Sequence, residues 1–146
     1  MMSASGQTLV TFNVRGGMND HEKRLSISCW ISKQRCAVAV LTECHGNAAS
    51  LPYYQSQFSN SVWCLRDTDV HGGVGIVCDR SARIVSNHCF VPRLYDSECS
   101  GRALLAKVEI NFAAICIVGT YAPAQARERV GFLMLLASGF PFSKSS

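Results

Sequence analysis

Several features that would assign this sequence to a special class are scarce or missing. No apolar stretch approaches the roughly 20 residues that a membrane-spanning helix needs, so we expect no span. Charged residues make up 16% of the chain, against roughly 25% in a typical soluble domain. Hydrophobic residues make up 48%, which is the opposite of the balance found in disordered chains. The 146 residues are therefore expected to form one domain with a sizeable core.

Paired cysteine motifs are also missing, although the chain has eight cysteines. None of them stands in a Cys-x-x-Cys pair or at a zinc-type spacing, and several lie inside apolar segments. We therefore expect buried free thiols in a reducing compartment. The N-terminal stretch MMSASGQTLV lacks a basic segment followed by an apolar one, so we expect no secretory signal and an intracellular protein, nuclear or cytoplasmic.

The first part of the chain has the pattern of a strand, a helix and a second strand. Residues 8–14 (TLVTFNV) are rich in β-branched and aromatic residues and end at RGG. Asn19 or Asp20 can cap a helix that continues to about Gln34. Residues 36–42 (CAVAVLT) then form a continuous apolar strand of the kind that is buried on both faces.

This order brings two polar residues to the same edge of the predicted sheet. A strand, helix, strand crossover makes the two strands parallel, so their carboxyl ends lie side by side. Asn13 ends the first strand and Glu43 follows the second. Because a charge at the end of a buried strand has to lie at the rim of the sheet, we expect Asn13 and Glu43 to be neighbours there.

The remaining segments predict an α/β protein with a mixed sheet. Gly75 within an apolar strand indicates a bulge or a close backbone approach. The organisation is one domain over residues 8–136, with tails at 1–7 and 137–146. The expected elements are a loop or short helix at 51–58, strands at 61–66, 74–79, 82–91, 102–110 and 113–123, and a helix at 124–136.

Five motifs in this chain resemble those of the endonuclease/exonuclease/phosphatase superfamily. In order they are TFNVRG, LTECH, GGVGIV, DSECSGRALL and VGTYAP, the last followed by a segment that carries arginines. The likeness is greatest to apurinic-type endonucleases and to the endonuclease domains of LINE-type retrotransposons. It covers residues 8–136 but only the N-terminal half, or a little more, of the family's domain. The resemblance implies a partial two-sheet α/β sandwich of the DNase I-like type, with a mixed sheet and an early βαβ crossover.

The same resemblance assigns roles to individual residues. Glu43 looks like the metal-binding glutamate that ends the family's second strand, and Asn13 like the asparagine that supports the metal or the phosphate. Tyr121 looks like the catalytic tyrosine that contacts the scissile phosphate. His45 matches a histidine of the retrotransposon branch and is expected only to lie near the site. The implied cofactor is Mg²⁺, with Mn²⁺ as a substitute, and oxygen ligands of these types suit it. The implied substrate is DNA or another phosphodiester.

The sequence also departs from the family pattern. Thr42 stands where the family usually has glutamine, and Ala124 where it has asparagine. No Asp-x-Asn motif follows Tyr121, and the terminal Asp-His pair is missing. Because the members of such a constellation act as a unit, we expect this chain to be an inactive fragment by itself. A partner chain that completes the fold is a further expectation.

Other interpretations stay open at this stage. The substrate could instead be a phosphomonoester or a lipid phosphodiester, or the chain could be a non-catalytic, nucleic-acid-binding relic. The net charge of +4 fits an anionic partner but is only a mild basic excess. Asn13 could simply form a turn, Glu43 could be a solvated strand end, and Tyr121 could be a packed aromatic. Arg102 could meet a phosphate or pair with Glu98, and a structural role is favoured.

Overall fold

The computed structural model describes residues 8–65, 72–89, 102–121, 129, 130 and 134. The expected tails, residues 92–101 between two expected strands, and most of the expected C-terminal helix lie outside these residues, although 129, 130 and 134 are helical. The described elements are β1 (Leu9–Asn13), α1 (His21–Gln34), β2 (Val38–Thr42), a 3₁₀ turn η2 (Ala48–Ser50), α2 (Leu51–Gln57), β3 (Ser61–Cys64), β4 (Val74–Cys78), β5 (Ala82–Cys89), β6 (Ala103–Ile110) and β7 (Ala113–Thr120).

The strands form two sheets. The first is mixed and has the order β1-β2-β4-β3, with β1 parallel to β2 and the other neighbours antiparallel. The second is an antiparallel sheet of β5, β6 and β7. The α/β class, the two sheets and the early crossover are therefore confirmed. The crossover pairs Asn13 with Thr42, so the carboxyl ends of β1 and β2 lie at one edge, as the sequence predicted.

The first helix begins and ends where the sequence indicated. The Asp20 side chain accepts a hydrogen bond from the Glu22 backbone N–H, which satisfies one of the free donors at the helix start. Arg35 adopts a left-handed conformation with φ 51° and ends the helix after Gln34. The chain then turns directly into β2, which completes the crossover.

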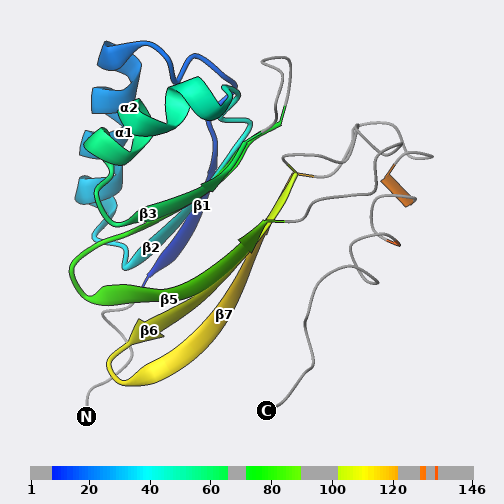
Figure 1. The fold of residues 1–146 in the computed structure, drawn as a ribbon. Coiled ribbons are helices and arrows are strands. Elements are labelled where there is room, and N and C mark those ends of the chain that lie inside the picture. Colours follow the sequence, from blue (N-terminus) through cyan, green and yellow to red (C-terminus); the bar gives the residue numbers. More distant parts are fainter. Residues whose placement is uncertain (1–7, 66–71, 90–101, 122–128, 131–133, 135–146) are drawn as a thin grey trace.

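Two layers cover the two faces of the first sheet (Figure 1). Helices α1 and α2 lie on one face, and the β5-β6-β7 sheet lies on the other. Every residue of β2 is buried because its side chains alternate between these layers. Val38 and Val40 belong to the core between the sheets, whereas Ala39 and Leu41 belong to the core beneath the helices.

Two glycines allow close packing at these layers. A Cβ on Gly75 would lie 2.3 Å from the Trp63 ring, which rests on the helix side of the sheet, so the expected close approach is confirmed. A Cβ on Gly119 of β7 would lie 2.8 Å from a Val40 methyl group and 2.9 Å from a Val74 methyl group. The second sheet can therefore approach the first closely at the end of β7.

The cysteines fulfil the sequence expectation in part. The seven that the structure describes are free thiols, and those at 36, 44, 64 and 78 are buried. Cys29 and Cys116 are exposed, so for these two the expectation of buried thiols is wrong. Within the described residues, no helix is both long and apolar enough to cross a membrane.

Candidate functional site

Three side chains from distant parts of the chain meet at the carboxyl edge of the first sheet. Glu43 follows β2, Asn13 ends β1, and Tyr121 follows β7. The Tyr121 hydroxyl donates a short hydrogen bond to Oε1 of Glu43, across 78 positions of sequence. The Asn13 side chain also acts on the Glu43 carboxylate, because it lowers the Glu43 pKa. The structure thus brings all three sequence-predicted site residues together.

The backbone holds Glu43 at the rim. It leaves the strand with φ 53°, a left-handed conformation that is uncommon for a residue other than glycine. Its carbonyl oxygen accepts the Gly16 N–H at 2.7 Å, and the Thr42 carbonyl accepts the Val14 N–H at 2.8 Å. On the other side, the Cys44 N–H donates to the Gly73 carbonyl at 3.1 Å. Backbone hydrogen bonds from the loop after β1 and from the loop before β4 therefore fix the chain on both sides of Glu43.

Asn13 acts on two groups at once. Its amide oxygen accepts the Arg15 backbone N–H at 2.9 Å, a local turn that Asn commonly forms. The amide nitrogen remains as the donor toward the Glu43 carboxylate. Asn13 therefore forms a local turn through its amide oxygen and faces the Glu43 carboxylate with its amide nitrogen.

Tyr121 is held in place by Arg102, which immediately precedes β6. The Tyr121 N–H donates to the Arg102 carbonyl at 2.8 Å, and the Arg102 Nη1 donates to the Tyr121 carbonyl at 3.1 Å. The guanidinium also lies 5.2 Å from the centre of the Tyr121 ring, within cation–π range. Arg102 is buried, so its structural role fits the sequence interpretation, although Tyr121 rather than Glu98 is the contact described.

The hydrogen bonds at this site change the acidity of both partners. The Tyr121 hydroxyl is the main reason that the pKa of Glu43 is lowered, and burial opposes it in part. The Asn13 amide and the charges of His45 and Arg15 lower the Glu43 pKa further. The same hydrogen bond raises the pKa of Tyr121, with burial as the second cause. At neutral pH the site therefore holds an ionised carboxylate and a neutral phenol.

His45 lies beside the site, where the resemblance placed it. A Cβ on Gly16 would come within 2.5 Å of the His45 Nδ1, so the ring packs directly on the loop after β1. The His45 N–H donates to the Gly72 carbonyl at 2.8 Å, and its own carbonyl accepts the Tyr54 hydroxyl at 3.2 Å. His45 therefore joins the loops that surround Glu43.

The donor set is compatible with a hard cation. Mg²⁺ is bound in proteins by one or two carboxylates and keeps several waters or substrate oxygens. Glu43 supplies one ionised, half-buried carboxylate, which has lone pairs beyond those used by Tyr121 and Asn13. Within the described part of the chain, no group of three or more His, Cys, Asp or Glu side chains is placed to hold a metal. A cation here would therefore depend on Glu43, water and substrate oxygens.

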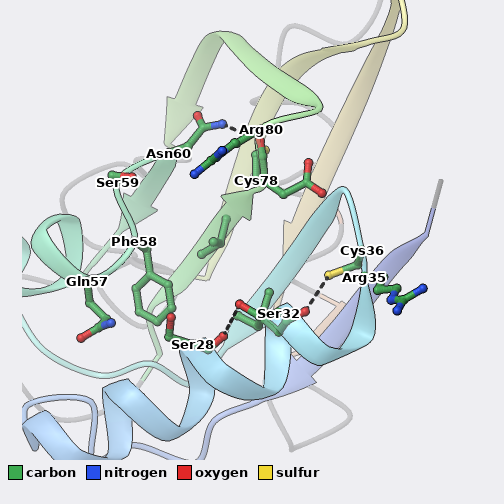
Figure 2. Close-up of a pocket in the computed structure, with 13 residues that line it drawn as sticks. Ser28, Ser32, Arg35, Cys36, Gln57, Phe58, Ser59, Asn60, Cys78 and Arg80 are labelled. Atoms are coloured by element: carbon green, nitrogen blue, oxygen red, sulfur yellow. Dashed lines mark hydrogen bonds between the residues drawn. The ribbon is translucent and has the colours of Figure 1, made fainter. Parts of the chain in front are cut away.

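A separate pocket lies at the opposite end of the first sheet, where Val38 pairs with Cys78 (Figure 2). Its volume is about 450 Å³. The Ser32 hydroxyl donates to the Ser28 carbonyl at 3.1 Å, and Asn60 donates to the Asp79 and Ala82 carbonyls. These lining groups thus already bond to the backbone, and we assign the pocket no role. It is lined by Ser28, Ile31, Ser32, Arg35, Cys36, Gln57, Phe58, Ser59, Asn60, Val77, Cys78, Asp79 and Arg80.

Two packed sheets with flanking helices and a carboxylate at the strand ends define a DNase I-like α/β fold. No family model matches the sequence, and no curated protein matches it either. Solved structures with this fold do match, and they are members of the endonuclease/exonuclease/phosphatase superfamily. The resemblance inferred from the motifs is therefore confirmed at the level of the fold.

Three of these structures illustrate the extent of the likeness. An AP endonuclease from Archaeoglobus fulgidus has a TM-score of 0.65 and 16% identity over 89% of this chain and 49% of its own. The APE2 catalytic domain from Xenopus laevis has a TM-score of 0.62 and 16% identity over 88% and 51%. The 3′ phosphatase NExo from Neisseria, bound to a product DNA hairpin, has a TM-score of 0.62 and 14% identity over 89% and 50%. The chain spans about half the length of these structures.

Proposed function

We propose that this chain carries the metal-binding half of a Mg²⁺-dependent phosphodiester hydrolase site of the endonuclease type. The observation that carries the proposal is the contact of Tyr121 with Glu43, which joins the two sheets at the edge where Asn13 also lies. The likeness to DNA-processing enzymes supports DNA as the substrate class. An ionised carboxylate, an amide and a phenol are the groups that such chemistry requires from this part of a site.

Each residue has a distinct part in this proposal. Glu43 would hold the cation, which supplies charge stabilisation to the phosphate when bound. Asn13 keeps the carboxylate oriented through its amide nitrogen. Tyr121 holds its single hydroxyl donor at the same point and would donate it to a phosphate oxygen in place of Glu43 when substrate is bound, with Arg102 fixing its backbone and ring. Arg15 adds positive charge beside an anionic substrate.

The proposal includes inactivity of this chain by itself. The residues after Tyr121 contain neither the Asp-x-Asn motif nor the Asp-His pair with which the family positions and activates the attacking water. Those groups would have to come from residues outside this chain, for example from a partner chain that completes the fold. The chain would then bind metal and substrate without turning substrate over.

Titration of the purified chain with Mg²⁺ tests the metal site. We expect saturable binding by calorimetry, with shifts of the Glu43 backbone amide in NMR spectra, and loss of both in Glu43→Gln. Glu109→Gln is the matched control, because it removes the same charge from an exposed pair with Arg83 on the second sheet. Absence of binding to a folded wild-type chain would contradict the proposal.

A nicking assay on supercoiled DNA tests the inactivity. We expect no cleavage above background with Mg²⁺ or Mn²⁺. Robust cleavage that disappears in Glu43→Gln would show that the chain is a complete enzyme.

A phosphatase is the second candidate, because one similar structure is that of a 3′ phosphatase. A panel of a 3′-phosphorylated oligonucleotide, an abasic duplex and a lipid phosphodiester separates these substrate classes by binding. Preference for the 3′-phosphorylated end would favour the phosphatase interpretation.

A further inference from the structure

A second polar pocket lies close to the loops that follow β1 and β2. It has a volume of about 500 Å³ and is lined by residues of three short segments. These are the start of α1, the η2 turn and the start of α2. Among the described residues, none that lines it carries a carboxylate. The lining residues are Asn19, Arg24, Asn47, Ala49, Ser50 and Tyr53.

Arg24 is the unusual member of this pocket because its charge is buried. Its side chain is only 6% exposed. Nη1 donates to the Met18 carbonyl at 2.8 Å, but the buried Nε–H has no hydrogen-bond acceptor among the described residues. No carboxylate of the described residues forms an ion pair with Arg24. A buried cation without a counterion is costly, so an anion bound in the pocket would offset this cost.

The surroundings of Arg24 indicate what kind of anion would fit. Tyr53 places its ring 5.6 Å from the guanidinium and is itself 62% exposed. Asn19 and Asn47 add amide groups at the wall of the pocket, although the Asn47 oxygen already accepts the Ala49 N–H at 2.9 Å. A guanidinium suits a phosphate, and an exposed aromatic ring suits a stacked base.

The charges that face this pocket leave room for a phosphate. Asp20 and Glu22 stand at the start of the same helix, but Asp20 caps the helix and neither residue lines the pocket. Lys23 is next to Arg24, and its ammonium group donates to the carbonyls of Val14 and Gly16 on the loop after β1. Lys23 therefore places a positive charge on the loop after β1, and Arg24 places one in the pocket.

We infer that the Arg24 pocket binds a backbone phosphate of a nucleic-acid strand whose neighbouring base stacks on Tyr53. The inference deepens the proposed function, because the strand would be the substrate that crosses the Glu43 site. Asn47 lies four residues after Glu43, so the pocket and the carboxylate are carried by one continuous segment at the edge of the sheet. This subsite needs no metal, since its charge comes from Arg24.

The first test observes Arg24 in the unmodified chain. The side-chain Nε–H signal of Arg24, assigned through its loss in Arg24→Lys, is followed by NMR while a short oligothymidylate is added in the presence of a chelator. We expect this signal to shift and saturate together with Tyr53 ring signals. An unchanged Arg24 signal at saturating oligonucleotide would overturn the inference. Because no metal is present, failure of the magnesium proposal at Glu43 does not affect the result.

The second test uses variants and fluorescence anisotropy with the same oligonucleotide. Tyr53→Ala leaves the core untouched and should weaken binding by roughly fivefold to a hundredfold, the range expected for one stacked base. Arg24→Gln should also lower the dependence of log affinity on log salt by about 0.7, as expected for one lost phosphate contact on a single strand. Lys33→Gln is the control, since it removes a charge from the exposed last turn of the same helix.

Inorganic phosphate distinguishes the source of the anion. The inference expects phosphate alone to shift the Arg24 signal weakly, with Tyr53 unaffected. If phosphate binds as tightly as the oligonucleotide and Tyr53→Ala changes neither affinity, the site is a simple anion site and the assignment to nucleic acid is overturned.

Discussion

The Tyr121 hydroxyl donates to the Glu43 carboxylate, and this hydrogen bond joins the two sheets at the candidate site. Glu43 comes from the first sheet through β2, and Tyr121 from the second through β7. Gly119 makes the contact possible, because it lets the end of β7 approach Val40 and Val74. The geometry of the site is therefore coupled to the packing of the two layers.

Tyr121→Phe removes the strongest cause of the lowered pKa of Glu43. The pKa of Glu43 is therefore expected to rise toward its ordinary value of 4.5, measured by NMR titration of the Glu43 carboxyl carbon. The free energy of unfolding should fall by about 1 kcal/mol at neutral pH, at the modest end because both groups are half-buried. Tyr53→Phe is the control on an exposed tyrosine. An unchanged Glu43 titration would show that the hydrogen bond does not form in solution.

Glu43 should also contribute to the acid dependence of stability. Its pKa is lowered in the folded state, so the unfolded chain binds the proton more readily. The stabilisation is therefore present above the unfolded pKa, near 4.5, and is lost as pH falls through the folded pKa. The difference in unfolding free energy between wild type and Glu43→Gln, measured with urea, should shrink below that pH. A difference that stays constant into the acid range would contradict this.

Tyr121 should show the reverse behaviour in alkali. Its pKa is raised above 10.0, first by the hydrogen bond to Glu43, so its stabilisation is present at lower pH and is lost as pH rises through the folded pKa. In Glu43→Gln the Tyr121 pKa should move back down. Ultraviolet absorbance of tyrosinate, compared with a Tyr121→Phe reference to isolate this residue, measures the change. Identical titrations in wild type and Glu43→Gln would exclude the coupling.

Gly119→Val should separate the sheets. The added side chain would collide with Val40 and Val74, and overpacking of this kind costs about 1–3 kcal/mol. Tyr121 should withdraw from Glu43 as a result, so magnesium affinity should fall along with stability. Ala114→Val on the exposed part of the same strand is the control and should change neither quantity much. A Gly119→Val chain with normal stability would show that the close approach is not required.

The thiols should divide into two classes of reactivity. Cys29 and Cys116 are exposed and should be alkylated rapidly in the native state. Burial raises the pKa of Cys78 to about 11 and raises that of the fully buried Cys44 further, so these two should react only after unfolding. Mass spectrometry of peptides after timed alkylation measures the four rates. Fast native labelling of Cys44 would indicate that the segment after β2 opens.

The sequence alone determined the elements and one edge of the site. The capping residue Asp20, the break after residue 14 and the apolar β2 segment are local signals, so the crossover and the neighbourhood of Asn13 and Glu43 could be predicted from them. The motifs also indicated Tyr121 as a site residue. The inference of the elements and the crossover succeeded because short-range patterning dictates where a strand or helix begins and ends, and the crossover connects consecutive elements.

Only the tertiary structure decided how those residues act. The contact of Tyr121 with Glu43 spans 78 positions and depends on how two separate sheets pack, which no local pattern specifies. The contact of Arg102 with Tyr121 likewise depends on the pairing of β6 with β7. The exposure of Cys116 also could not be read from its apolar sequence neighbours. The burial of Arg24 became visible only when α1 and α2 packed side by side, because side-chain burial is a property of three-dimensional neighbours and not of sequence spacing.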